Sequence, residues 1–441
     1  VIPQILLIAF RKKLFDFPDE RKVHHCAVPR LGGIAFKPVV FFTIALLLGI
    51  NMVLGHSEIL SEIGNDVCSL AFAFCSIMAL YLVGMADDLI GIRYRAKFVI
   101  QILCGVMLIA GGVYINNLYG VLGIHAVPLW LGYPLTILIV VFIINAINLI
   151  DGIDGLASGL CSIACLFYGL TFFMLHQYVY AMLAFATLGV LVPFFYYNVF
   201  GNAKHGRKIF MGDTGSLTIG MMLCFLSLKL TMCGLDDNTG NVHPMVLAFS
   251  PLLVPCCDVV RVYLHRVRNG KNPFLPDKNH IHHKLLALGI KQRNTMIIIV
   301  SVSTIFILLN ILLSLYLNVN WIVLGDILIW TLANIRLTKS IGQLQSEQKT
   351  NKSKSMKYEN QIHFILIDRG FPAGIMCHAE SRLFHGPETG YRRTSLEPAG
   401  NPGASRRQDL NTGQQQGPLV DEPFQPSDHI QTDRYDIGNI Q

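Results

Sequence analysis

Two aspartates end a long apolar run in the segment Asn145–Leu156, which reads NAINLIDGIDGL. Because residues 134–144 before it are suited to a membrane helix, we expect Asp151 and Asp154 where that helix meets water. A charged side chain in hydrocarbon costs at least ~2.5–3.5 kcal/mol, so ionisable residues at such places mark candidate functional sites.

Asn145, Asn148, Asp151 and Asp154 recur at every third position and would share one face if the segment stays helical or nearly so. A polar stripe beside hydrocarbon needs a polar partner, which a metal phosphate or a nucleotide would supply. The alternative is that the two Asp-Gly pairs are only turn residues.

A second acidic motif, Asp87-Asp88, ends another apolar run. Adjacent aspartates repel each other, so both stay ionised only beside a cation or a basic group. Lys97 stands near the start of the next helix, where a phosphate could meet both its ammonium and the helix N-terminus. Solvated acids at a helix end are the alternative interpretation.

A third acid, Asp213, opens the apolar run that follows Gly212. Helix capping alone would explain it. If all these acids lie at one membrane face, however, Asp213 becomes a candidate metal ligand, with Asp88 beside it. Carboxylate oxygens, phosphate and water suit Mg²⁺ or Mn²⁺.

Three histidines, His280, His282 and His283, stand in a long basic loop. They indicate either metal binding or contact with phosphate. The chain has 11 cysteines but no CxxC pair, so we predict neither a zinc site nor a disulfide framework and favour phosphate contact.

The composition places these motifs in a membrane protein, because 52% of the residues are hydrophobic and only 14% are charged. Apolar runs of about 18 residues or more predict spanning helices. The runs lie near residues 34–54, 67–85, 98–115, 128–148, 157–175, 179–197, 216–233, 243–263, 296–317 and 319–337. Val1–Phe10 is also apolar but short, and we expect it to be the end of a truncated first helix. The predicted fold class is all-α, a polytopic membrane helical bundle, since open sheet edges are not stable in hydrocarbon.

Lysine and arginine fall in alternate loops, around residues 11–30, 93–97, 204–208 and 266–293. The positive-inside rule makes these loops cytoplasmic, and it puts all five aspartates on the same side. The net charge of +7 follows mostly from this bias and gives no evidence for nucleic-acid binding.

The chain divides by composition into two parts. Residues 1–341 form the predicted membrane domain, and residues 342–441 form a polar cytoplasmic tail that we expect to be disordered, because such a sequence buries too little apolar surface to fold alone.

Taken in order, the motifs resemble those of the polyprenyl-phosphate N-acetylhexosamine-1-phosphate transferases, the superfamily that includes phospho-MurNAc-pentapeptide translocase. The matching pieces are Asp16-x-Pro18-x-x-Arg21-Lys22-x-His24, Pro29-Arg-Leu-Gly-Gly33, Asp87-Asp88-x-x-Gly91, Arg95-x-Lys97-x-x-x-Gln101, Asn145 to Leu156, Phe210-x-Gly-Asp213-x-Gly-Ser216, Asp258 to Arg261, and Pro273 to His283. The resemblance covers about residues 11–340.

The resemblance implies about eleven spanning helices in the bacterial cytoplasmic (inner) membrane, with the active site facing the cytoplasm. It implies transfer of a sugar 1-phosphate from a UDP-sugar to undecaprenyl phosphate, with release of UMP and a need for Mg²⁺, as the first membrane step of a cell-envelope polysaccharide. The His-Ile-His-His loop is similar to that of the N-acetylglucosamine branch. The oligomeric state, a homodimer included, stays open.

Residue roles follow from the same resemblance. Asp213 would bind the metal, and Asp87 and Asp88 would handle the lipid phosphate or complete the metal shell. The remaining expected site residues bind nucleotide, phosphate or sugar: Asn145, Asn148, Asp151, Asp154, Lys97, His280, His282 and His283.

Two other functions are weighed. The same chemistry could use UDP-MurNAc-pentapeptide or another UDP-hexosamine. A secondary transporter would also place acids in a helical bundle, but transporters show inverted repeats and midplane sites, whereas these acids collect at one face and no repeat is found.

Overall fold

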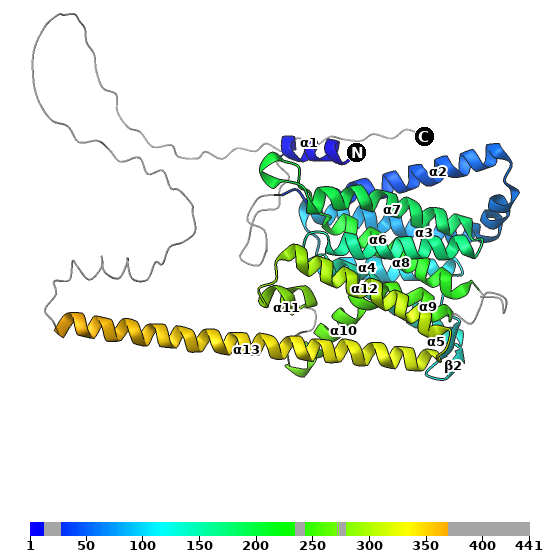
Figure 1. Cartoon of the computed structure of the whole chain (residues 1–441). Helices are drawn as coiled ribbons and strands as arrows, with labels where there is room; N and C mark the ends of the chain where they lie inside the picture. The colour runs from blue at the N-terminus through cyan, green and yellow to red at the C-terminus, as the bar shows by residue number, and fades with distance from the viewer. Residues whose placement is uncertain (13–27, 234–242, 271, 273–278, 369–441) are drawn as a thin grey trace, which may run out of the picture. The chain divides into compact units, whose positions relative to one another are not determined.

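The computed structural model describes residues 1–12, 28–233, 243–270, 272 and 279–368, and these residues are mostly helical (Figure 1). The chain divides into two units, residues 1–358 and 359–441. Residues 16–24 and 273–277, which carry two of the matching motifs, lie outside the described residues. The last helix, α13, continues to Asp368, so the predicted division at residue 341 and the disorder of the tail stay predictions.

Helices cover every apolar run predicted from the sequence. They are α1 (Ile2–Lys12), α2 (Phe36–Leu54), α3 (Ser57–Ile90), α4 (Tyr94–Ala110), α5 (Leu129–Ile150), α6 (Leu156–Met174), α7 (Tyr178–Val199), α8 (Gly212–Met232), α9 (Pro244–Phe249), α10 (Leu253–Arg268), α11 (Ile281–Ala287), α12 (Gln292–Ser314) and α13 (Val319–Asp368). Within the described residues, 9 helical segments are long and apolar enough to cross a membrane. The chain is therefore a polytopic helical membrane protein, as predicted.

Helix α8 is the buried centre of the bundle, packed mainly against α3 and α5. Its first turns carry small residues, Gly212, Thr214, Gly215, Ser216 and Gly220. Without a hydrophobic driving force between helices in lipid, such residues let helix backbones approach closely and pack well. The close approach is visible at Gly84 of α3, where a β-carbon would lie 2.6 Å from the Cα of Thr214.

The chain just before α2 pairs with the chain just before α8. The Gly32 and Gly33 amides donate to the carbonyls of Phe210 and Met211, both at 2.9 Å, and the Phe210 amide donates to Pro29 at 2.9 Å. Gly33 lies directly against the backbone of Gly215, leaving no room for a side chain. This pairing fixes where α8 begins.

Two local features differ from the sequence prediction. Part of the loop 116–127 forms an antiparallel hairpin of β1 (Asn117–Val121) and β2 (Ile124–Ala126), which an all-α prediction omits. Gly123 in its turn and Gly120 near the end of β1 both adopt positive φ. The run 243–263 is broken at Ser250–Leu252, a 3₁₀ turn with Pro251 that joins α9 to α10.

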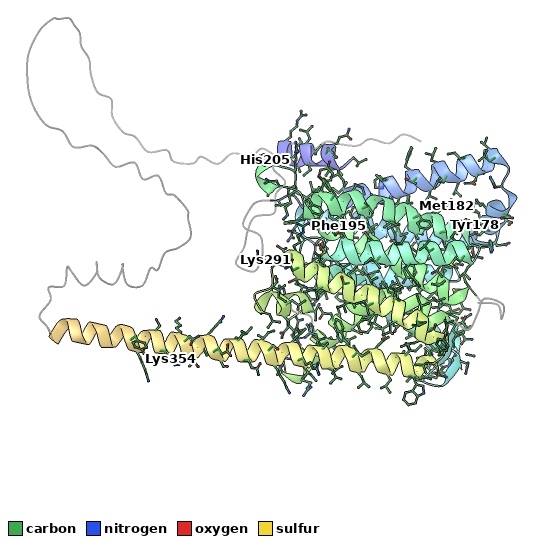
Figure 2. All side chains as sticks on the ribbon, viewed as in Figure 1. Tyr178, Met182, Phe195, His205, Lys291 and Lys354 are labelled. Carbon is green, nitrogen blue, oxygen red and sulfur yellow. The ribbon has the colours of Figure 1, made fainter. Side chains whose placement is uncertain are left out.

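The ends of the helices alternate along the bundle. Figure 2 shows His205 and Lys291 at one end and Tyr178 at the other. Helices α3, α5 and α7 finish at the end of His205, where α6, α8 and α12 start. The predicted gathering of acidic motifs at one end is therefore confirmed.

We predict that Gly33→Ala destabilises the protein by about 2 kcal/mol or more, because the added methyl overpacks the contact with Gly215. Thermal unfolding of the purified chain in detergent would measure this. Gly49→Ala on exposed α2 is the matched control, since its β-carbon meets no atom within 4 Å. Equal melting temperatures for the two variants would contradict the close contact.

Candidate active site

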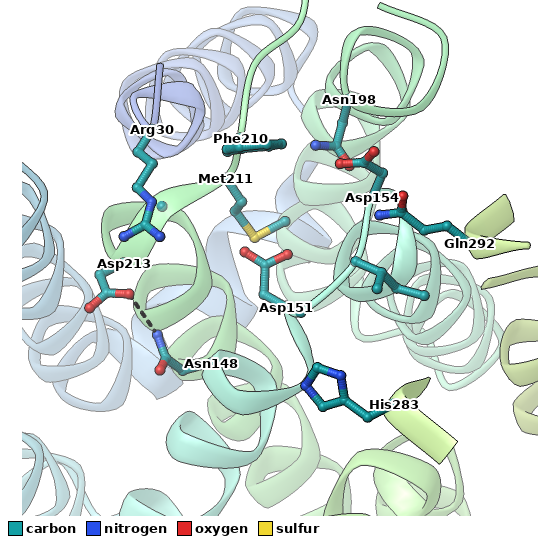
Figure 3. A pocket seen from close by; sticks show the side chains of 13 residues that line it. Arg30, Asn148, Asp151, Asp154, Asn198, Phe210, Met211, Asp213, His283 and Gln292 are labelled. Carbon is teal, nitrogen blue, oxygen red and sulfur yellow. Dashed lines mark hydrogen bonds between the residues drawn. The ribbon is translucent and has the colours of Figure 1, made fainter. Parts of the chain in front are cut away.

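Asp151, Asp154 and Asp213 line one pocket of 280 Å³ at the His205 end of the bundle, and Asp87 and Asp88 lie behind Asp213 through the contacts described below. Figure 3 shows Asp151 among the lining side chains, with Asp213 and Asn148 on one side and Asp154 and Asn198 on the other. Its polar lining residues are Arg30, Asn148, Asp151, Asp154, Asn198, Asp213, His283 and Gln292.

Asp88 binds the N-terminus of α8. Its carboxylate accepts the amides of Asp213 and Thr214, both at 2.8 Å, and the Thr214 hydroxyl at 2.6 Å. An anion is favourable here because the first amides of a helix lack intrahelical acceptors and carry its positive dipole end. Asp88 thereby attaches the end of α3 to α8 and orients Asp213.

Lys97 connects Asp87 with Asp213. Its ammonium pairs with Asp87 at 2.6 Å and also with Asp213. Asp87 in addition accepts the Ile92 amide at 2.6 Å, which closes the turn between α3 and α4. The opposite oxygen of Asp213 accepts the Asn148 amide at 3.1 Å. Asp87 therefore positions Lys97, and Lys97 offsets the charge of Asp213.

Asp151 is the free carboxylate of the pocket. Among the described residues it has neither a hydrogen-bond nor an ion-pair partner. It is open to the pocket, yet the surrounding protein displaces much of its water, and this desolvation followed by the charges of Asp213 and Asp154 raises the pKa of Asp151 to about 7. A bound cation would favour its ionised form.

Asp154 lies in the turn 151–155, which also carries Asp151, and it pairs with Lys208 at 2.5 Å. The turn is held by Asn198 of α7, which accepts the Gly155 amide at 2.6 Å and donates to the Ile209 carbonyl at 2.9 Å. Asn198 thus ties the turn 151–155 to the chain that leads into α8.

The predicted stripe of Asn145, Asn148, Asp151 and Asp154 is divided by the end of α5 at Ile150. Asn148 and both aspartates reach the pocket. Asn145 instead faces α4, donating to Gln101 at 2.7 Å, and it is absent from the lining.

The three histidines take different positions. His280 is buried and contacts Asp258 at 2.9 Å through Nδ1. His282 is buried against Gly152, and desolvation followed by the neighbouring histidines lowers the pKa of His282 to about 3, so it stays neutral at physiological pH. His283 lines the pocket. Only His283 is placed to meet a ligand there.

Some site residues had no assigned role in the sequence prediction. Arg30, Asn198, Phe210 and Gln292 line the pocket but come from separate segments. Asp258 is fully buried and organises the histidine loop by accepting from Arg261 at 2.8 Å and the Ile281 amide at 3.0 Å. An aspartate inside the apolar run 243–263 was the available signal for it.

A divalent cation fits this donor set. In the part of the chain that the structure describes, no three His, Cys, Asp or Glu side chains come close enough to form a complete protein cage. Mg²⁺ does not need one, since it is usually held by one or two carboxylates together with water and substrate phosphate. Asp151 and Asp213, which line the same pocket, supply that number.

We predict that Asp151→Asn raises the melting temperature at pH 8 in chelator and has little effect near pH 4. An unfolded aspartate titrates near ~3.9, so the raised folded pKa makes wild-type stability fall as the pH rises from there through about 7. Differential scanning fluorimetry would measure it.

The control is Asp154→Asn, which removes an ion pair with Lys208 and should give no stabilisation. Excess Mg²⁺ should reduce the difference in melting temperature between wild type and Asp151→Asn. A gap independent of pH would contradict an unpaired, partly protonated Asp151.

Comparison with known proteins assigns this site to a family. Residues 70–231 match the model for glycosyl transferase family 4. The chain is 31% identical over 322 residues to a probable undecaprenyl-phosphate N-acetylglucosaminyl 1-phosphate transferase of Bacillus subtilis (strain 168), covering 71% of this chain and 81% of the relative. It is 28% identical over 309 residues to the undecaprenyl-phosphate alpha-N-acetylglucosaminyl 1-phosphate transferase of Yersinia pestis, covering 69% and 78% of the two chains.

The matched region contains α4, α5, α6 and α7 completely, together with every aspartate of the pocket. The sequence matches and the gathered acidic motifs agree, and the chain therefore belongs to glycosyl transferase family 4, the polyprenyl-phosphate N-acetylhexosamine-1-phosphate transferases.

Proposed function

We propose that this phosphoglycosyltransferase transfers N-acetylglucosamine 1-phosphate from UDP-N-acetylglucosamine to undecaprenyl phosphate and releases UMP. The proposal rests on Asp151, which has no hydrogen-bond or ion-pair partner in the described part of the chain. It lies in a pocket that also holds Asp213 and is flanked by Lys97, Lys208 and Arg30. Such a site suits a metal-bound diphosphate. The names of the relatives support N-acetylglucosamine as the sugar.

Magnesium would be held by Asp213 and Asp151. When bound, it would neutralise charge on the diphosphate and stabilise the departing phosphate. Asp88, expected from the sequence to be a second ligand, acts in this proposal through the N-terminus of α8, because three hydrogen bonds already occupy its oxygens.

The lipid phosphate is the nucleophile. An oxygen of this phosphate attacks the sugar-bearing phosphorus of the UDP-sugar; one phosphorus–oxygen bond forms, the bond to UMP breaks, and UMP leaves with the electron pair. A phosphate monoester has a second pKa near ~6 and is already mostly ionised at pH 7, so no side chain needs to take a proton. The protein's task is to position two anions against their mutual repulsion.

The basic side chains make that approach favourable. Lys97 pairs with both Asp87 and Asp213. A cation bound to Asp213 would replace Lys97 there and leave the Lys97 ammonium free to contact a phosphate. His283 and Arg30, which line the same pocket, would contact the nucleotide or sugar phosphates. Asp154 holds Lys208 at the opposite wall. Asp87 is thus a positioning residue for Lys97.

The pocket end is proposed to face the cytoplasm, where UDP-sugars are made. The basic loops at residues 93–97, 204–208 and 291–293 lie at that end, as the positive-inside rule requires. Helix α4, 17 residues or about 25 Å long, is proposed as a further span beside the 9 segments that are long and apolar enough.

We predict that membranes carrying the chain convert undecaprenyl phosphate and labelled UDP-N-acetylglucosamine into labelled lipid and UMP when Mg²⁺ is present. Asp213→Asn should reduce turnover by about 10³-fold or more, since it removes a charge beside the reacting phosphates. Thin-layer separation of the labelled lipid would measure the product.

Controls separate the residue roles and the substrates. Asp87→Asn should keep a measurable remnant of activity, because Lys97 still pairs with Asp213. UDP-MurNAc-pentapeptide tested in parallel distinguishes the alternative substrate. Formation of the labelled lipid by Asp213→Asn at the wild-type rate would reject the proposed site.

We predict opposite labelling of the two bundle ends in intact cells. A membrane-impermeant maleimide should label Tyr178→Cys and leave His205→Cys unlabelled, each measured against the parent chain because its own Cys68 and Cys75 are exposed. The reverse pattern would contradict a cytoplasmic active site.

A further inference from the structure

A second cavity, of 440 Å³, lies among α5, α9, α10, α12 and α13. Its walls are almost entirely apolar, and its polar groups are a small set: Ser250, Cys256, Asn310 and Asp326. This volume lies within the ~300–1,000 Å³ of typical ligand pockets. The cavity shares no lining residue with the catalytic pocket.

Asp326 is a buried acid without a counter-ion. Its side chain is 6% exposed, and its hydrogen-bond partner is the amide of Asn310 at 2.8 Å. Within the described residues no lysine, arginine or histidine pairs with it. A carboxylate inside a spanning helix is costly and marks a functional site by default.

Asn310 supplies a second, independent sign of an incomplete site. The residue is 1% exposed, and its Oδ1 atom has no hydrogen-bond partner although its Nδ2 donates to both Ser250 and Asp326. Buried polar atoms without partners cost free energy and are rare in native proteins. Both residues line the cavity, where Asp326 accepts one neutral hydrogen bond, from Asn310, and Asn310 Oδ1 accepts none from the described residues.

The cavity lies toward the end of the bundle opposite the catalytic pocket. Gln292, at the start of α12, lines the catalytic pocket, whereas Asn310 is four residues before the end of that helix. Asp326 is seven residues, or about 10 Å, from the start of α13. Both acceptors therefore lie within candidate spanning helices, toward the end of the bundle away from the catalytic pocket.

We propose that this cavity binds a cationic amphiphile, a molecule with a primary ammonium or guanidinium group on an apolar body, that enters from the lipid. The cation would pair with Asp326 and donate to Asn310, and the apolar body would lie against side chains such as Ile139, Phe142 and Ile322. A charged donor in a low-dielectric cavity satisfies both acceptors at once.

The apolar walls favour this occupant over a bare metal ion. A cation held by Asp326, Asn310 and Ser250 alone would have at most four oxygen ligands, fewer than the six to eight that hard divalent cations take. An amine needs only hydrogen-bond acceptors, and its hydrocarbon part gains from contact with the remaining lining.

Binding can be measured with the full chain in nanodiscs of zwitterionic lipid. The probe is a brominated dodecylamine, which quenches nearby tryptophan fluorescence, and Trp321 and Trp330 stand on α13 on either side of Asp326. The matching brominated dodecanol reports simple partition into the bilayer. We expect the amine to bind wild type at least about tenfold more tightly than Asp326→Asn, the size of a lost hydrogen bond to a charged group, while the alcohol does not distinguish them.

Glu58→Gln is the matched control, because Glu58 is an exposed acid at the same end of the bundle but outside this cavity, and it should bind the amine as wild type does. Asp326→Asn removes a buried charge that has no counter-ion among the described residues, so the variant is expected to fold. Its transferase activity and melting temperature would verify that it is folded. Equal amine affinity in wild type and Asp326→Asn would overturn the proposal, as would equal weakening in Glu58→Gln. If Na⁺ or Mg²⁺ abolished the quenching by the amine in wild type but not in Asp326→Asn, the cavity would be a metal site and the proposal would be overturned.

Discussion

The contact between Asp88 and the N-terminus of α8 is the interaction on which the site depends. α8 is the buried centre of the bundle, and its first amides would be unsatisfied in a region with little water. Asp88 supplies the missing acceptors and a compensating charge. The same contact sets the position of Asp213 relative to α3, and so relative to Lys97 and Asp87. Close packing of Gly84 and Gly33 against α8 makes the contact geometrically possible.

Charge is distributed unevenly among the five aspartates. Asp87, Asp154 and Asp213 have ammonium partners, Asp88 has amides, and Asp151 has no such partner among the described residues. Desolvation and the neighbouring carboxylates both oppose ionisation of Asp151, so a cation bound beside it would favour its ionised form. In the proposed function, affinity for the cation would thereby be linked to a cost in stability, a common arrangement at functional sites.

Most of the fold followed from the sequence because its signals are local. Apolar runs of spanning length and the alternation of basic loops need no long-range information, and the helices lie where those runs are. The gathering of Asp87, Asp151 and Asp213 at one end also followed, since consecutive spans alternate in direction.

The partners of each acid did not follow from the sequence. That Asn145 faces Gln101, that Asn198 holds Gly155, and that Asp258 organises the histidine loop all depend on helix rotation and on contacts between distant segments. Periodicity alone does not determine these contacts, and the end of α5 at Ile150 divided a stripe whose spacing suggested one face.

The pairing of residues 29–33 with residues 210–211 affects the order in which the site forms during synthesis and membrane insertion. The two strands of chain are separated by most of the membrane domain, and Gln292 completes the pocket still later. As the chain leaves the ribosome, Asp87 and Asp88 therefore lack the α8 amides until five further helices, α4 to α8, have been inserted and packed against α3. Catalytic competence is thus a late event in biogenesis, and an incompletely made chain would bind neither the cation nor its substrates.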